Sequence, residues 1–144
     1  MIEIKFRGRR QNGGWIHGAL IPAEFSGWGV PSIADKNFRY EVKPDTICPY
    51  TGYKDADGKE IYEGDVLRLL DERDIEGNMV VLFGENEGTL WGRENYGFYV
   101  AFTCAKLNER LRQDFLFWLR KGVKVVGNIH DNPELMVYKE EKES

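Results

Sequence analysis

Apolar and polar residues alternate in short runs along much of the chain, which is the pattern of half-buried β-strands. The first two runs cover residues 2–7 and 15–21, and Asn12-Gly13-Gly14 lies between them. Glycine supplies the backbone freedom that a tight turn needs. The pattern therefore predicts an N-terminal hairpin.

Residues 22–40 contain prolines and glycines that interrupt any regular element. We expect an ordered loop here, with one short strand near residues 30–33 and another at residues 40–42. The segment also holds three large aromatic residues: Phe25, Trp28 and Phe38. The sequence does not indicate what covers these aromatic side chains.

A second series of strands is predicted further along the chain. A tight turn is expected at Asp57-Gly58, between two short extended arms. The runs that follow are residues 66–70, 79–83, 89–91, 96–102 and 123–129. Asn132-Pro133 is expected to turn the chain after the last of them.

One segment changes to a helical period. Spacings of three and four residues separate a set of apolar positions on one helical face: Leu107, Leu111, Phe115, Trp118 and Leu119. They predict a helix over about 104–121, with Thr103 as N-cap and Gly122 after its C-terminus. Leu116 and Phe117 widen the face, so either the N-terminal arm or a second copy of the chain is expected to cover it. This face is our candidate for self-association.

These elements predict a mainly β protein with three parts. Residues 60–138 are expected to form a small SH3-like antiparallel barrel, with the amphipathic helix inserted before its closing strand. Residues 1–59 are expected to form a β-rich N-terminal arm, and residues 139–144 a charged, mobile tail. A chain of 144 residues with 42% hydrophobic and 13% aromatic content can build such a core.

The composition limits the environment in which the protein works. No run approaches the roughly 20 apolar residues that cross a bilayer, so no membrane association is expected. The N-terminus lacks the apolar core of a signal peptide, which predicts a cytoplasmic protein. Cys48 and Cys104 are then expected to be reduced thiols rather than a disulfide.

Charge is unevenly distributed along the chain. The formal net charge is −4, but residues 1–50 carry +2 and the remainder −6. The positive residues gather near the N-terminus: Lys5, Arg7, Arg9 and Arg10. Alternation places Lys5, Arg7 and Arg9 on one face of the first strand, where Trp15 or Trp28 would add a stacking surface for nucleic acid. The alternative, which we favour, is a solvated strand edge whose charges prevent sheet-to-sheet aggregation.

Several motifs resemble reactive sites without meeting their requirements. Residues 55–60 have the acidic character of a calcium loop, but the glycine follows the second aspartate directly and both flanks are extended. A hairpin turn explains them better. In Glu63-Gly64-Asp65, Gly64 is expected to supply a special backbone conformation and Asp65 to bind turn amides.

Two further patterns were considered for catalysis and for phosphate binding. His130 and Asp131 are adjacent in an extended segment, so their side chains are expected to point apart rather than form an acid–base pair. Gly8 and Gly13-Gly14 precede no helix that could hold a phosphate. The two cysteines and two histidines, His17 and His130, lack metal-ligand spacing. We therefore assign no catalytic, cofactor-binding or metal-binding residue, and we expect no cofactor.

A set of short motifs runs through most of the chain in a characteristic order. They are Phe6-Arg7-Gly8, Trp15 with His17-Gly18-Ala19-Leu20, Asp45-Thr46-Ile47, residues 50–55, residues 57–66 and residues 125–135. In this order and rough spacing the chain resembles the YopX-like proteins of bacteriophages and prophages. The resemblance implies a phage or prophage origin and an SH3-like C-terminal barrel. It implies no activity, and it assigns no functional residue.

The leading hypothesis is a non-catalytic accessory protein that acts by binding, as a scaffold that recruits copies of itself or a host or phage protein. One alternative is a nucleic-acid-associated phage protein that uses the basic N-terminal strand. The other is an enzyme whose dispersed site a single sequence does not reveal. The segment at residues 20–44 departs most from the family pattern and is a candidate for individual specificity.

Overall fold

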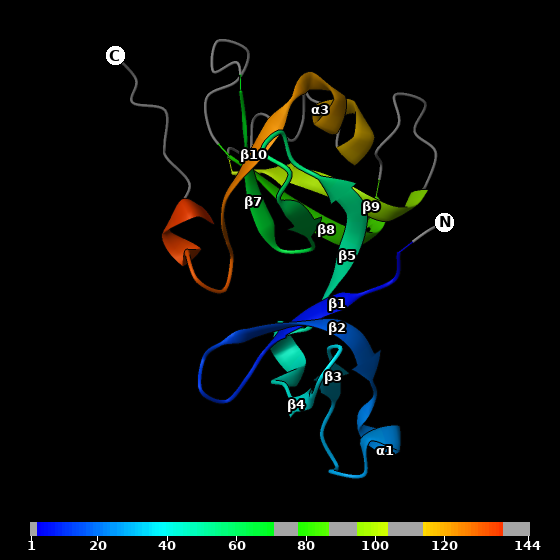
Figure 1. Cartoon of the computed structure of the whole chain (residues 1–144). Coiled ribbons are helices and arrows are strands. Elements are labelled where there is room, and N and C mark those ends of the chain that lie inside the picture. Colours follow the sequence, from blue (N-terminus) through cyan, green and yellow to red (C-terminus); the bar gives the residue numbers. More distant parts are fainter. Residues whose placement is uncertain (1–2, 71–77, 87–94, 104–113, 137–144) are drawn as a thin grey trace. The chain divides into compact units, whose positions relative to one another are not determined.

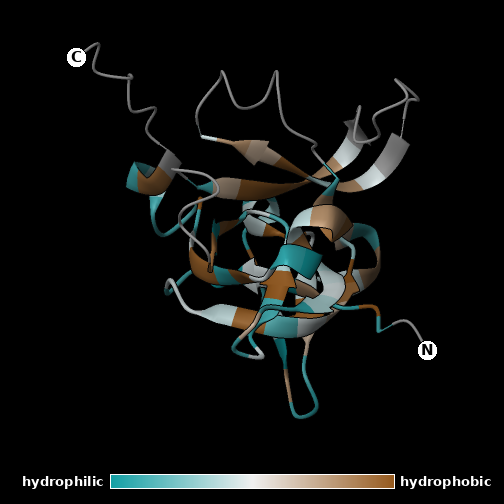
Figure 2. Cartoon of the chain, turned by 90° about the horizontal axis from the view of Figure 1, so that it is seen from above, coloured by the Kyte–Doolittle hydropathy of each residue, from teal (hydrophilic) through white to brown (hydrophobic). Residues whose placement is uncertain are grey.

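The computed structural model describes residues 3–70, 78–86, 95–103 and 114–136. They belong to two compact units, Met1–Tyr53 and Lys54–Ser144 (Figure 1). Both units are built on antiparallel sheets with a few short helices, which confirms the mainly β class. Figure 2 colours the ribbon by hydropathy and shows apolar and polar stretches along the strands.

The N-terminal unit contains the predicted hairpin and three further strands. Its strands are β1 (Phe6–Arg9), β2 (Trp15–Ile21), β3 (Ser32–Ala34), β4 (Arg39–Glu41) and β5 (Cys48–Lys54), in the sheet order β4-β3-β2-β1-β5. A short helix, α1 (Ala23–Ser26), and a 3-10 turn at Pro44–Thr46 connect them. The turn between β1 and β2 closes with a hydrogen bond of 2.8 Å from the Arg10 amide to the Gly14 carbonyl oxygen.

The small core of this unit depends on a glycine. Ile33 and Val42 are almost fully buried, with 0% and 1% of their surface exposed. A Cβ atom at Gly8 would lie 2.9 Å from the Val42 Cβ and 3.0 Å from the Ile33 Cδ1, closer than carbon atoms normally approach. The absence of a side chain on β1 is therefore what lets β1 approach these two residues.

The C-terminal unit is a second antiparallel sheet covered by a helix. Its elements are β6 (Glu60–Tyr62), β7 (Asp65–Leu69), β8 (Met79–Asn86), β9 (Asn95–Phe102), α3 (Phe115–Lys121), β10 (Val123–Asn128) and a 3-10 turn at Pro133–Met136. The sheet order is β10-β7-β8-β9. Four of the predicted strands are thus present, while the one expected at residues 89–91 lies outside the described residues. Among the described strands, β9 and β10 are the two edges of this sheet and do not pair with each other. The sheet is therefore not closed into the barrel that the sequence predicted.

The predicted long helix is wrong in its N-terminal boundary. Asp114 has an extended backbone and forms a β-bridge with Tyr99, so a continuous helix does not pass through it. Instead Asp114 is the N-cap of α3, because its side chain accepts a hydrogen bond from the Leu116 amide at 3.2 Å. Thr103 is therefore not the cap of this helix. The predicted C-terminal end is confirmed, since Gly122 follows Lys121 with φ +95°.

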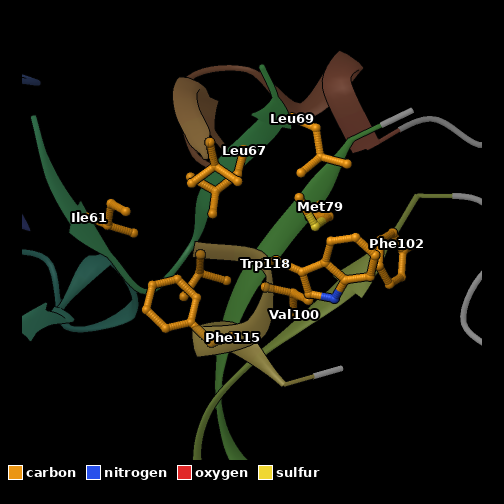
Figure 3. Packing of buried hydrophobic residues seen from close by; sticks show 10 residues of the cluster. Ile61, Leu67, Leu69, Met79, Val100, Phe102, Phe115 and Trp118 are labelled. Atoms are coloured by element: carbon orange, nitrogen blue, oxygen red, sulfur yellow. The ribbon is translucent and has the colours of Figure 1, made fainter. Parts of the chain in front are cut away.

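The hydrophobic core of the C-terminal unit lies between α3 and the sheet (Figure 3). Its buried residues are Ile61, Leu67, Leu69, Met79, Val81, Val100, Phe102, Phe115, Trp118 and Val123. The indole of Trp118 packs edge-on against Phe102, with ring centroids 5.4 Å apart. Only 3% of its surface is exposed, so Trp118 belongs to the interior of its own chain.

Trp118→Ala is expected to lower the free energy of unfolding of the C-terminal unit by about 3–5 kcal/mol, because it leaves a cavity where the indole packs. Urea unfolding followed by circular dichroism measures this change. Leu70→Ala, at a side chain that is 53% exposed, is the control and should have a small effect. If Trp118→Ala is as stable as the wild type but has a lower molecular mass in solution, because it forms a smaller oligomer, then Trp118 lies at an interface between copies instead.

Candidate binding surface

Positively charged side chains of the N-terminal unit lie over aromatic rings. The contacts, measured to the ring centroid, are Lys5 on Tyr50 at 4.9 Å, Arg7 and Arg9 on Trp15 at 5.0 and 4.9 Å, Arg10 on Tyr40 at 4.4 Å, and Arg39 on Trp28 at 3.8 Å. Such cation–π contacts hold long basic side chains in defined positions.

The strand register places the basic residues of β1 as the alternation predicts. Arg9 is opposite Trp15 and Arg7 is opposite His17, and residues opposite each other in a sheet share a face. Arg7 has only 7% of its surface exposed, however, so its side chain is not presented to solvent. The basic strand is thus less available to phosphate than its sequence suggests.

The two most exposed aromatic residues of this unit, Phe25 and Phe38, lie in the segment that the sequence left unexplained, and Trp28 lies in the same segment. Phe25 is 75% exposed, Phe38 is 65% exposed and Trp28 is 44% exposed. Phe25 is in α1, Trp28 follows that helix, and Phe38 precedes β4. The contact of Arg39 with Trp28 brings the two segments together. We call Phe25, Trp28 and Phe38 the aromatic surface.

Two polar side chains hold this surface in place. The buried hydroxyl of Ser26 donates to the Val30 carbonyl oxygen at 2.7 Å and accepts a hydrogen bond from the Trp28 amide at 3.1 Å. The Asp35 Oδ1 atom accepts hydrogen bonds from the Phe38 and Asn37 amides, both at 2.8 Å. These amides hold the pKa of Asp35 below its ordinary value. The loop backbone is therefore fixed by hydrogen bonds while its aromatic side chains stay exposed.

The acidic turn at residues 55–59 is a structural element of the C-terminal unit, as expected. The Asp55 Oδ1 atom accepts hydrogen bonds from the Asp57 and Lys59 amides at 2.9 Å each, and its Oδ2 atom accepts one from the Val125 amide at 2.9 Å. Gly58 takes the left-handed conformation, with φ +84°. This carboxylate thus joins the turn to β10.

The Glu63-Gly64-Asp65 turn also has the predicted structural role. Gly64 has φ +85°, a conformation that favours glycine. Its amide donates to the Val81 carbonyl oxygen at 2.7 Å, and its carbonyl oxygen accepts from the Ile129 amide at 2.9 Å. Asp65, with 1% of its surface exposed, accepts a hydrogen bond from the Tyr62 amide at 2.8 Å.

The His130-Asp131 pair lies in a turn whose centre is an asparagine. The Asn128 Oδ1 atom accepts hydrogen bonds from the amides of His130 and Asp131, at 3.0 and 2.9 Å. The side chain of Asn132 accepts a further one from the Asn128 amide at 3.3 Å. A Cβ atom at Gly127 would lie 2.5 Å from that side-chain oxygen, so the turn requires glycine there. The motif that marks the C-terminal end of the resemblance is therefore a turn-building motif.

The cysteines and the possible metal ligands were also considered from the sequence. The buried thiol of Cys48 donates to the Thr46 carbonyl oxygen at 3.2 Å, whereas Cys104 lies outside the described residues. Within the described part of the chain, no three His, Cys, Asp or Glu residues are grouped so that they could hold a metal ion. No helix among these residues is long and apolar enough to cross a membrane.

The predicted self-association face divides into two parts. Phe115 and Trp118 are in the core of the C-terminal unit, and Leu116, Phe117 and Leu119 pack against that core. Leu107 and Leu111 lie outside the described residues, so their part of the prediction stays a prediction.

A family model described as "YopX protein" matches residues 30–137. The chain therefore belongs to the YopX family, as its motifs indicated. A search of curated proteins found no match.

The fold also resembles a solved structure titled "Crystal structure of protein EF1440 from Enterococcus faecalis". The likeness has a TM-score of 0.51 at 22% sequence identity, and it covers 94% of this chain and 99% of the other. At this identity the likeness shows the fold and not a function.

Asp55→Asn is expected to destabilise the C-terminal unit and to weaken its acid sensitivity. Burial raises the pKa of Asp55, but the amides of Val125, Lys59 and Asp57 and the Lys59 charge outweigh it, so the pKa lies below its ordinary value. The unfolded state then takes up the proton first as pH falls. The stabilisation is present above the ordinary carboxyl pKa of about 3.9 and is lost on acidification through the lower folded value.

Urea unfolding of the wild type and Asp55→Asn, measured from pH 7 down to acid, tests this prediction. At pH 7 the variant should lose about 1–3 kcal/mol, since an amide group cannot accept all three hydrogen bonds. Asp57→Asn, at an exposed side chain of the same turn, is the control. Equal pH profiles for the wild type and Asp55→Asn would contradict the assigned role of Asp55.

Proposed function

We propose that this YopX-family protein is a cytoplasmic accessory protein of a bacteriophage or prophage that acts by binding a host or phage protein. Family membership supports the phage origin, because the resemblance is to proteins of phages and prophages. The observation that carries the binding role is the aromatic surface of the N-terminal unit. It lies in the segment where the chain departs most from the family pattern.

The aromatic surface has the composition of a protein interface. Tryptophan and arginine are enriched among the residues that contribute most to binding, and the Trp28–Arg39 pair combines them at 3.8 Å. Exposing Phe25 and Phe38 to water is unfavourable, and burying them against a partner would remove that cost. The hydrogen bonds of Ser26 and Asp35 fix the loop backbone beforehand, so binding would cost less ordering entropy.

Nucleic acid is a second candidate partner, because the cation–aromatic pairs of this unit also suit base stacking. Aromatic rings beside arginine are the usual elements of sites for single strands. The burial of Arg7 and the formal net charge of −4 count against a phosphate-binding role. If nucleic acid is the partner, binding should weaken steeply with salt and with Arg9→Glu and Arg10→Glu.

The proposal predicts that a tagged wild-type protein retains a specific protein from nuclease-treated host lysate, identified by mass spectrometry. Replacing Phe25 and Phe38 together by serine should reduce recovery about tenfold or more, because two exposed anchors are lost. Leu70→Ser, at an exposed apolar side chain of the C-terminal unit, is the matched control and should leave recovery unchanged.

Equal recovery of the same protein by all three forms would contradict a role for the aromatic surface. Recovery only of material that disappears with nuclease would favour the nucleic-acid candidate instead.

A further inference from the structure

Arg39, in β4, is held against the ring of Trp28. The Cζ atom of Arg39 lies 3.8 Å from the ring centroid, which is closer than in the other four cation–aromatic contacts given above. A guanidinium at this distance stacks through its flat face, because an N–H group pointing at the ring would keep the Cζ atom further away. The contact therefore fixes the Arg39 side chain and leaves the N–H groups at its edge for another partner.

Within the part of the chain that the structure describes, Arg39 has no carboxylate partner. No ion pair joins its guanidinium to an Asp or Glu side chain there, Glu41 of the same strand included. The side chain of Arg39 is also partly exposed. Arginine binds a carboxylate through two parallel hydrogen bonds, which makes such pairs strong and specific in geometry. Arg39 is thus a fixed donor that can take a carboxylate from another molecule.

Exposed apolar surface accompanies this donor. Trp28 itself is 44% exposed, and Phe38, the residue before Arg39, is 65% exposed. Phe25, three residues before Trp28, is 75% exposed. A partner that covers these rings would also shield the arginine from water, and a charge-assisted hydrogen bond is stronger in that setting. The site therefore suits a chain that carries both a carboxylate and apolar side chains.

The charges around this donor do not suit a polyanion. Residues 22–43 contain equal numbers of basic and acidic residues, which are Lys36, Arg39 and Lys43 against Glu24, Asp35 and Glu41. A segment without excess positive charge does not attract nucleic acid from a distance, and the exposed Glu24 and Glu41 would repel successive phosphates. A peptide carries its carboxylates singly between neutral residues, so one of them can pair with Arg39 without bringing further negative charge.

We infer that the aromatic surface takes an acidic and apolar peptide segment of a partner protein, and that a carboxylate of this segment pairs with Arg39 where it is stacked on Trp28. The inference rests on the proposed function and names the chemistry of the partner at the same site. The aromatic rings supply contact area, and the arginine selects for the acidic residue. A segment with an amide or a basic residue in that place would lose the pair.

Selection from a random peptide library displayed on filamentous phage tests the inference with the purified protein. Peptides retained by the immobilised wild type should contain Asp or Glu beside aromatic or leucine residues. A selected peptide is then synthesised with a fluorescent label, and its affinity is measured by fluorescence anisotropy. R39Q should weaken binding about tenfold or more, because it removes a charge-assisted pair. R39K should keep only part of the affinity, since an ammonium cannot form two parallel hydrogen bonds from a flat stack.

A double-mutant cycle separates the ion pair from any change in the loop. The peptide is made again with its acidic residue replaced by the matching amide. This replacement should weaken binding to the wild type about tenfold and binding to R39Q very little, because the pair is already absent in R39Q. K36Q, at an exposed cation of the neighbouring turn, is the matched control and should behave like the wild type. Circular dichroism of each variant checks that it is folded.

The inference is overturned if the library yields no peptide or peptides without an excess of Asp and Glu, if R39Q leaves the affinity unchanged, or if the amide replacement costs the wild type and R39Q equally. Displacement of the peptide by an oligothymidine at a comparable concentration would favour nucleic acid at this site and would also overturn it. A lysate protein whose recovery depends on Phe25 and Phe38 but not on Arg39 would leave the proposed function standing and contradict only this inference.

Discussion

The carboxylate of Asp55 is the interaction on which the C-terminal unit most depends. It lies at the start of that unit, and it accepts hydrogen bonds both from its own turn and from the Val125 amide, which is 70 residues later in the sequence. A hydrogen bond from the Ala56 amide to the Val123 carbonyl oxygen, 3.0 Å long, joins the same two segments. A buried carboxylate needs such donors, so the turn and β10 are stable only together. The turn that leads into β6, the first strand of the unit, is thereby bonded to β10, its last strand.

Two of the motifs that carry the family resemblance, residues 57–66 and 125–135, build turns. Gly58 and Gly64 take left-handed conformations, Asp65 accepts a hydrogen bond from the Tyr62 amide, and Asn128 does the same for His130 and Asp131. Both of these motifs therefore have a structural explanation in the described residues. Membership of the YopX family is consequently informative about the fold, whereas it does not identify a binding partner.

The features that we connect with binding lie together in the N-terminal unit. Ser26 and Asp35 fix the loop and turn that carry the aromatic surface, and the Trp28–Arg39 contact joins that surface to β4.

The sequence by itself determined the mainly β class, the first hairpin, most of the strands of the C-terminal unit and the roles of its turns. Alternation has a period of two, and glycine and aspartate have specific turn chemistry, so these features depend on neighbouring residues alone. The start of α3 was not predictable in this way. Apolar spacing continues before residue 115, but the backbone of Asp114 is extended and bridges to Tyr99, a residue brought close only by folding.

The candidate binding surface was decided by the tertiary structure. From the sequence, the large apolar side chains of Phe25, Trp28 and Phe38 were expected to be covered by other residues, and Arg7 was expected to be exposed to solvent. The structure shows the reverse, because the three rings are exposed and Arg7 is buried. Burial and edge position depend on which strands become neighbours. The local pattern of alternation is the same for a side chain that faces water and for one that a distant segment covers.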